Sequence, residues 1–195
     1  MKYEDQLHEY ITKHDGIVLT VEVEKAGIPR QYLRILEQKK ELERIAHGVY
    51  LVPGERKDDM YCIQVRSNRI VFSNQTAREM NGLSDKKDEK YTVTVPRSYA
   101  TNRLRDTGVH VTTVKEECFD VGLTKMRTPC GRKVQVYDLE RTICDTVKNR
   151  NKIGEKTFKA VLERYEKMPN RDMKKLKKYA IQMEMTKTIR KFFKF

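Results

Sequence analysis

The spacing of apolar residues in the first 53 positions predicts several different elements. Helical spacing predicts helices over residues 4–14, 21–26 and 29–40. Two β-prone runs, 42–45 and 49–52, follow and are joined by a turn that contains a glycine. Three helices followed by a hairpin is the order of a winged helix-turn-helix.

The turn between the second and third predicted helices has residues suited to it. Thr20 is expected to cap the start of the second helix. Gly27 ends that helix, because glycine readily adopts the left-handed conformation, and Pro29 suits the first position of the next helix. Ile28 is a misfit there, because isoleucine is a poor N-cap.

The outer face of the third helix carries side chains of the types that can read DNA bases. Arg30, Gln31 and Arg34 lie in its N-terminal half, where arginine can bond guanine and glutamine can bond adenine in the major groove. Tyr32 either completes the apolar stripe or offers its hydroxyl to a phosphate. Phosphate contacts are expected in the two helices, and backbone or minor-groove contacts on the wing. The full set of predicted DNA contacts is Thr20, Arg30, Gln31, Tyr32, Arg34, Lys39, Arg44 and His47. The alternative is a winged helix that serves as a protein-binding module or scaffold.

The polar, turn-rich stretch 54–59 predicts a domain boundary, which divides the chain into residues 1–57 and 58–195. Strand patterns follow at 70–72, 91–95, 109–114, 121–126 and 133–137, and helical spacing runs from residue 138 to the end. The predicted fold class is α+β. An N-terminal winged helix-turn-helix precedes a mixed α/β C-terminal domain, which begins with a mixed sheet and ends in a helical segment.

The positive charge of the chain is concentrated near its C-terminus. The formal net charge is +13, but residues 1–57 carry ten Lys and Arg against ten Asp and Glu, whereas residues 148–195 carry sixteen against five. Because a neutral winged helix gains little from counterion release, the C-terminal helices are candidates for auxiliary phosphate contacts. These candidates are Lys174, Lys175, Lys177, Lys178, Arg190 and Lys191. The alternatives are an RNA- or acidic-protein-binding surface, or a solvated face.

Neither a metal nor a cofactor is expected. The four cysteines are scattered, and neither they nor the four histidines have metal-ligand spacing. Free thiols are the simplest interpretation. The chain has no apolar run near eighteen residues and begins with a charged segment, so a cytoplasmic protein without membrane contact is expected.

Acidic residues at two places raise the question of catalysis. Asp138 is predicted to cap a helix, Arg141 and Asp145 to form an ion pair one turn apart, and Glu140 to face away from Asp138. The loop from Asp85 to Lys90 loosely resembles the acidic-lysine pattern of metal-dependent nucleases, which makes a DNA-tethered nuclease the enzymatic alternative. Helix capping and an ion pair explain the acidic residues around Asp138, and a solvated turn explains those of the loop. The chain is therefore not expected to be an enzyme.

The chain contains four segments in this order: GIPRQYLRILEQKKELERIAHGVYLVP, SNQTAREMNGLSD, YTVTVP and TPCGRKVQVYDLERTICD. Together, and in this order, they resemble the AbiEi family, the antitoxins of AbiE toxin–antitoxin systems. One departure is Gln38-Lys39-Lys40, where a glycine often precedes the hairpin.

The resemblance implies a bacterial type IV antitoxin of abortive infection and phage defence. Its winged helix would bind double-stranded DNA, an operator with inverted repeats, and repress its own promoter. Its C-terminal domain would counteract a nucleotidyltransferase-like toxin without a stable complex.

Overall fold

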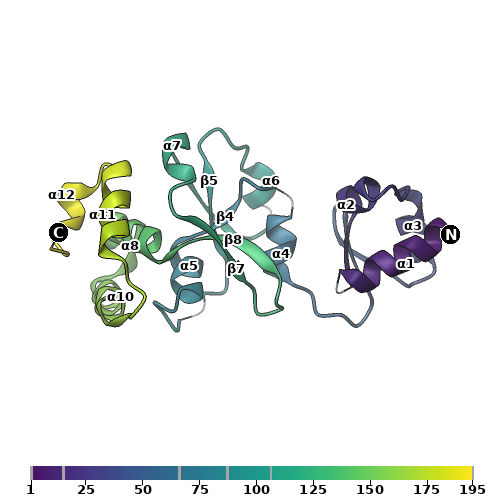
Figure 1. The fold of residues 1–195 in the computed structure, drawn as a ribbon, viewed down its shortest axis with the longest axis horizontal. Helices are drawn as coiled ribbons and strands as arrows, with labels where there is room; N and C mark the ends of the chain where they lie inside the picture. The colour runs from purple at the N-terminus through teal and green to yellow at the C-terminus, as the bar shows by residue number, and fades with distance from the viewer. Residues whose placement is uncertain (1, 15, 66, 87, 106, 195) are drawn as a thin grey trace. The chain divides into compact units, whose positions relative to one another are not determined.

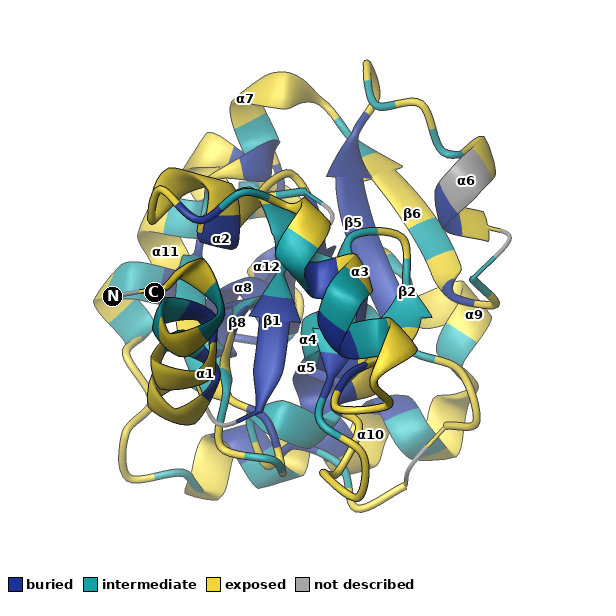
Figure 2. Cartoon of the chain, turned by 90° about the vertical axis from the view of Figure 1, so that its right-hand side faces the viewer, coloured by how far each residue is buried: buried dark blue, intermediate teal, exposed yellow. Residues whose placement is uncertain are grey.

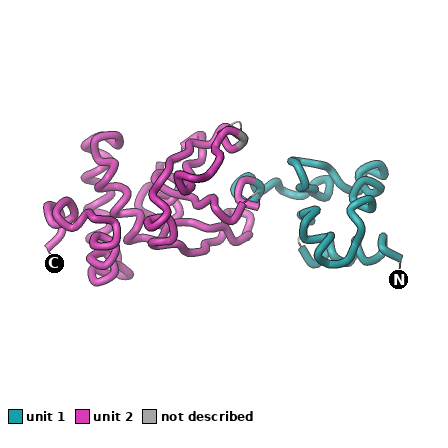
Figure 3. Tube along the Cα trace, turned by 90° about the horizontal axis from the view of Figure 1, so that it is seen from above, with its two compact units in different colours: residues 1–62 teal, residues 63–195 magenta. Residues whose placement is uncertain are grey.

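The computed structural model describes residues 1–195 except 1, 15, 66, 87, 106 and 195. The chain divides into two compact units, residues 1–62 and 63–195, shown in two colours in Figure 3. The division falls within α4 (Asp59–Gln64), just after the polar stretch in which the sequence predicts a domain boundary. Each unit is described by itself.

The first unit is a winged helix-turn-helix, as the sequence predicts (Figure 1). Its elements are α1 (Tyr3–Lys13), β1 (Ile17–Leu19), α2 (Thr20–Lys25), α3 (Gln31–Gln38), β2 (Glu43–Ala46) and β3 (Val49–Leu51). The three strands pair antiparallel in the order β1-β3-β2. The hairpin lies within one residue of its predicted bounds, whereas β1 was not predicted.

The turn between α2 and α3 gives Ile28 a different role from the one considered for it. Gly27 has a φ of +80°, and the amide of Ile28 donates to the Val23 carbonyl over 3.1 Å. This is the Schellman arrangement that ends a helix, in which the residue after the glycine makes an apolar contact with the last turn. Ile28 is only 3% exposed and shares a core cluster with Val23. It therefore closes α2 and does not cap α3, whose N-cap is Arg30.

Thr20 is not the helix cap that the sequence predicts. It is the first residue of α2, Leu19 occupies the N-cap position, and no side chain caps the helix there. The amide of Thr20 donates instead to the carbonyl of Gly48 in the hairpin, over 2.9 Å. This bond ties the start of α2 to the wing, so tertiary pairing replaces local capping.

Helix α3 ends in the same way as α2, but without a glycine. Lys40 has a φ of +59°, and the amide of Glu41 donates to the Leu36 carbonyl over 2.9 Å. A side chain in the left-handed conformation costs about 1 kcal/mol relative to glycine. Lys40 thus lies in Gln38-Lys39-Lys40, the segment that lacks the glycine expected before the hairpin.

Replacing Lys40 by glycine should raise the free energy of unfolding of the first unit by about 1 kcal/mol, because only the strained side chain is removed. Urea unfolding followed by circular dichroism measures this change. As a control, Gln38→Gly adds a glycine at a right-handed helical residue of α3, and there it should lower stability by about 0.5–1 kcal/mol. If both variants lowered the free energy of unfolding, the left-handed conformation of Lys40 would not be a source of strain.

The second unit is built on a five-stranded mixed sheet, as predicted. The strands are β4 (Val71–Phe72), β5 (Thr92–Pro96), β6 (His110–Val114), β7 (Leu123–Arg127) and β8 (Lys133–Tyr137). Their order is β6-β5-β4-β8-β7; β4 with β8 and β5 with β6 run parallel, and the other pairs are antiparallel. Figure 2 shows β5 as fully buried, whereas the edge strand β6 is largely exposed.

The helices of the second unit surround this sheet and extend beyond it at the C-terminal end (Figure 1). They are α5 (Asn74–Met80), α6 (Asn102–Arg105), α7 (Glu116–Phe119), α8 (Leu139–Lys148), α9 (Arg150–Ile153), α10 (Glu155–Lys167), α11 (Met173–Gln182) and α12 (Thr186–Ile189). In α8, every residue from Leu139 to Val147 is buried. Ile143, Tyr165, Leu176 and Ile189 form its apolar contacts with the last helices, so α8 joins the sheet to the helical segment.

Candidate nucleic-acid interface

The outer face of α3 presents three side chains with unused hydrogen-bond donors. Leu33 and Leu36 are 1% and 0% exposed and hold the opposite face against the core. Arg30, Gln31 and Arg34 are exposed, and their side chains make no hydrogen bond or ion pair with any residue that the structure describes. Buried leucines on one face and free donors on the other are the arrangement that a groove-reading helix requires.

Tyr32 belongs to the apolar stripe of α3. It is half-buried against the core cluster of the first unit, and its ring centroid lies 5.4 Å from that of Tyr3 in α1. Of the two roles considered for Tyr32, packing is therefore the one that the ring fulfils.

Lys39 differs from the three free side chains, because its ammonium group forms an ion pair with Glu4 of α1. The hydrogen bond to Glu4 raises the pKa of Lys39. A phosphate at this position has to compete with that carboxylate for Lys39.

The wing carries a second pair of predicted contacts. Nη2 of Arg44 lies 3.1 Å from Nδ1 of His47, and both side chains are exposed. Since a guanidinium can only donate, Nδ1 of His47 accepts this hydrogen bond. Gly48, with a φ of +69°, completes the turn beside them. The pair holds a positive charge at the tip of the hairpin.

One of the six cations predicted to make auxiliary phosphate contacts is already paired within the second unit. Lys174, Lys177, Lys178, Arg190 and Lys191 are exposed. Lys175 is the exception: its Nζ lies 2.9 Å from Oδ2 of Asp138 and 3.3 Å from Oε2 of Glu140. Burial alone would lower the pKa of Lys175, but its hydrogen bond to Asp138 and the two carboxylate charges raise it. Lys175 is therefore not free to contact phosphate.

This cluster corrects the expectation that Asp138 and Glu140 face apart. That expectation holds for residues two apart inside a helix. However, Asp138 is the N-cap of α8 and has an extended backbone. Lys175 of α11 contacts both carboxylates. Both acids are therefore engaged in joining α8 to α11.

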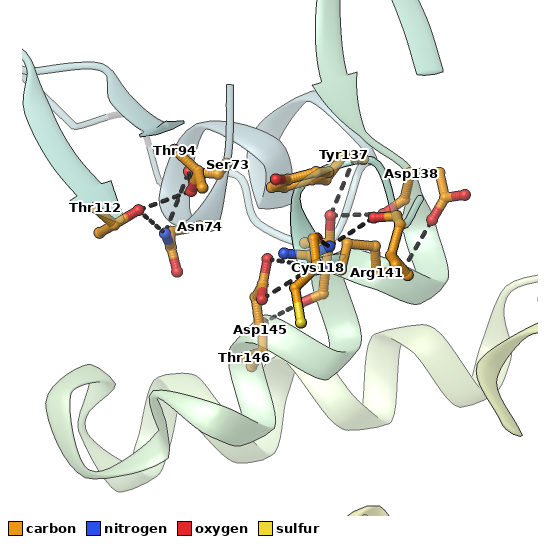
Figure 4. Close-up of polar contacts among 12 residues, drawn as sticks. Ser73, Asn74, Thr94, Thr112, Cys118, Tyr137, Asp138, Arg141, Asp145 and Thr146 are labelled. Atoms are coloured by element: carbon orange, nitrogen blue, oxygen red, sulfur yellow. Dashed lines mark hydrogen bonds and ion pairs between the residues drawn. The ribbon is translucent and has the colours of Figure 1, made fainter. Parts of the chain in front are cut away.

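The other predictions for this segment are confirmed, and Figure 4 shows the resulting network. Oδ1 of Asp138 accepts a bond of 2.9 Å from the amide of Arg141, which caps α8. The buried guanidinium of Arg141 lies 3.1 Å from Oδ2 of Asp145, and its Nη1 donates to the carbonyls of Cys118 and Val121 over 2.6 Å each. It also lies 4.0 Å from the ring centroid of Tyr137. Arg141 thus joins the loop before β7 to α8.

The acidic loop considered for a nuclease does not assemble a metal site in the part of it that the structure describes. Oδ2 of Asp85 lies 2.6 Å from Nη2 of Arg164, and Lys87 lies outside the described residues. Among the described residues of the whole chain, no three His, Cys, Asp or Glu side chains come close enough together to hold a metal ion. All four cysteines are free thiols.

Comparison with known proteins finds a family model that matches the first unit. Residues 5–53, from α1 through the hairpin, match the model of a family described as "Transcriptional regulator, AbiEi antitoxin". The winged helix is therefore of the class found in transcriptional regulators. The resemblance to the AbiEi antitoxin family is confirmed over these residues.

A solved structure has a similar fold over most of the chain. The RV2827C protein from Mycobacterium tuberculosis matches with a TM-score of 0.59 at 11% identity, covering 95% of this chain and 76% of that one. This similarity concerns the fold alone. None of the curated proteins compared matches the chain significantly. Among the described residues, no helix has both the length and the apolar character needed to cross a membrane.

Proposed function

We propose that this protein is an antitoxin and transcriptional autorepressor whose winged helix binds the operator of its own promoter. The observation that carries the proposal is the free outer face of α3, where Arg30, Gln31 and Arg34 stand exposed on a helix packed from behind by Leu33 and Leu36. The family match over residues 5–53 supports it, since that family is one of transcriptional regulators.

The finer parts of the proposal follow the AbiEi resemblance. The operator contains inverted repeats, and the C-terminal domain counteracts a nucleotidyltransferase-like toxin without forming a stable complex, as a type IV system in abortive infection and phage defence. The protein acts by binding and not by catalysis. The structural use of Asp138, Glu140 and Asp145 supports this, because each carboxylate is already paired with a cation.

Arg34→Ala should weaken binding to the operator by about 1–3 kcal/mol and change binding to random DNA much less, because an arginine at a base edge supplies specificity. Fluorescence anisotropy with the DNA upstream of the gene and with a scrambled duplex measures both affinities. In cells the same variant should lose repression yet still protect against the toxin, because protection is assigned to the second unit.

The matched control is Arg56→Ala, which removes an exposed arginine of the first unit outside α3 and the wing. This variant should bind both duplexes as the unchanged protein does. Wild-type binding by R34A would remove α3 as the reading helix, and loss of protection by R34A would overturn the division of roles between the units.

The exposed cations of α11 and α12 should contribute to the salt dependence of operator binding. Each phosphate contact steepens the slope of log K against log salt by about 0.9. Replacing Lys174, Lys177, Lys178 and Arg190 together by glutamine should therefore reduce the slope by about 3–4 in the full chain, if each contacts one phosphate.

The control for that slope removes four positive charges elsewhere in the second unit. Lys86, Lys90, Lys125 and Lys133 are exposed and lie outside α11 and α12. Equal slopes for the two quadruple variants would assign the effect to net charge alone. An unchanged slope in the first variant would exclude these helices from the DNA interface.

A further inference from the structure

A polar cleft in the second unit is not used by the proposed function. Its volume is about 420 Å³, in the range of about 300–1,000 Å³ that is usual for small-ligand sites. One wall comes from β5 and β6, and the other from the C-terminal end of α8 and from α9. The lining residues that matter here are Asn74, Thr112, Arg97, Lys148, Asn149 and Lys152.

The floor of the cleft is a connected set of neutral side chains, shown in Figure 4. Oγ1 of Thr94 lies 2.8 Å from Oγ of Ser73 and 2.7 Å from Oγ1 of Thr112. Asn74 extends the set: its Nδ2 donates to Thr112 over 3.4 Å, and its Oδ1 accepts a bond of 2.9 Å from Asn149. The two walls are therefore joined through Asn74, so the floor is built by the fold and supplies hydroxyl and amide groups.

The rim of the cleft is positively charged. Arg97, Lys148 and Lys152 are exposed, and none of them forms an ion pair with a residue that the structure describes. Asp145 also lines the cleft, but its side chain is buried and its carboxylate is already paired with Arg141. The charge facing a ligand is therefore that of the three cations.

We propose that this cleft binds the terminal phosphate of a nucleotide-sized ligand. A dianionic phosphate monoester matches three cations that line one cleft, and charge-assisted hydrogen bonds to its oxygens are stronger than neutral ones. The hydroxyl and amide groups of the floor supply donors and acceptors to the remainder of the ligand. That phosphate belongs either to a free nucleotide or to the phosphorylated 5′ end of a short nucleic-acid strand.

Titration calorimetry on the full chain tests the site with AMP and with a 5′-phosphorylated dinucleotide. Adenosine and the unphosphorylated dinucleotide are the matched probes without the terminal phosphate. We expect saturable binding of at least one phosphorylated probe and of neither matched probe. Binding of AMP identifies a free nucleotide as the source, whereas binding of the dinucleotide alone identifies a strand end.

Variants of the cleft locate the binding. Lys148→Gln with Lys152→Gln should weaken it by about tenfold or more, since two charged donors are lost, and Thr112→Val by about threefold through the loss of one neutral hydrogen bond. Lys125→Gln with Lys133→Gln removes the same charge from exposed lysines of β7 and β8 and should change the affinity by less than about twofold.

A measurement on the unchanged protein does not depend on any variant. The side-chain amide resonances of Asn74 and Asn149 should shift on addition of the phosphorylated probe, since these amides join the walls of the cleft. Absence of saturable binding of both phosphorylated probes would overturn the proposal. So would equal weakening by the two double variants, or binding that leaves both amides unmoved. Operator binding is measured separately, so failure here leaves the proposed function standing.

Discussion

Gly122→Ala should unfold the second unit or destabilise it by about 3 kcal/mol or more. Gly122 has a φ of +77°, and a Cβ built on it would lie 2.3 Å from Cβ of Arg141 and 3.1 Å from Oδ1 of Asp138. Left-handed strain contributes about 1–3 kcal/mol and overpacking a similar amount. Thermal unfolding followed by circular dichroism measures the loss.

Gly131→Ala separates these two contributions. Gly131 has a φ of +85°, but beyond its two chain neighbours no atom of the described residues lies within 4 Å of the position of an added Cβ. Its variant should show only the backbone cost, about 1–2 kcal/mol. If G122A is as stable as G131A or more stable, the close packing of Gly122 against Arg141 does not restrict which residue can occupy position 122.

Arg141→Met should cost about 3–5 kcal/mol, because it leaves a buried carboxylate without its cation. The side chain of Arg141 is fully buried and that of Asp145 is 8% exposed. The carbonyls of Cys118 and Val121 would also lose their donor. Urea unfolding measures the cost, and the double variant R141M/D145L should recover part of it.

The cost of R141M should shrink as the pH falls. Burial raises the pKa of Asp145, whereas Arg141 lowers it, so removing the arginine raises it further. A carboxyl whose pKa is higher in the folded than in the unfolded chain binds its proton more tightly when folded, so lowering the pH stabilises the fold. The difference between R141M and the unchanged protein should therefore be smaller at pH 5 than at pH 8.

Arg164→Met is the control for the arginine. Arg164 pairs with Asp85 at the surface, with side chains 41% and 87% exposed, so its loss should cost at most about 1 kcal/mol. Similar costs for R164M and R141M, or a cost of R141M that does not vary with pH, would contradict the buried ion pair as a major source of stability.

Local spacing predicted the parts of this fold that local interactions form. The cap of Asp138 on Arg141 and the ion pair of Arg141 with Asp145 lie within two turns of one helix, and both are present. The same spacing carries no information on the carbonyls of Cys118, in α7, and Val121, in the loop before β7, which meet Arg141 through tertiary packing.

Contacts between distant segments account for what the sequence did not predict. Strand β1 is too short to recognise from alternation, and it forms by pairing with β3. Ile28 is a local exception, because its partner Val23 lies only one turn back along the chain. Their contact follows from the Schellman turn, which the residue type of Ile28 does not reveal.

The predicted DNA contacts show the same division between local spacing and tertiary packing. Exposure of Arg30, Gln31 and Arg34 follows from helical spacing alone. The ion pairs of Lys39 with Glu4 and of Lys175 with Asp138 and Glu140 depend on where another helix lies. A count of positive charges therefore overstates how many are free to contact phosphate.

The pairing of β4 with β8 sets an order for events during synthesis on the ribosome. The parallel register joins Phe72 to Val136, so the centre of the larger sheet cannot close until most of the chain has emerged. The hairpin that completes the first unit ends at Leu51, and domains near the N-terminus generally fold first. The nascent chain should therefore carry a finished winged helix while β4, the central strand of the larger sheet, still lacks its partner β8.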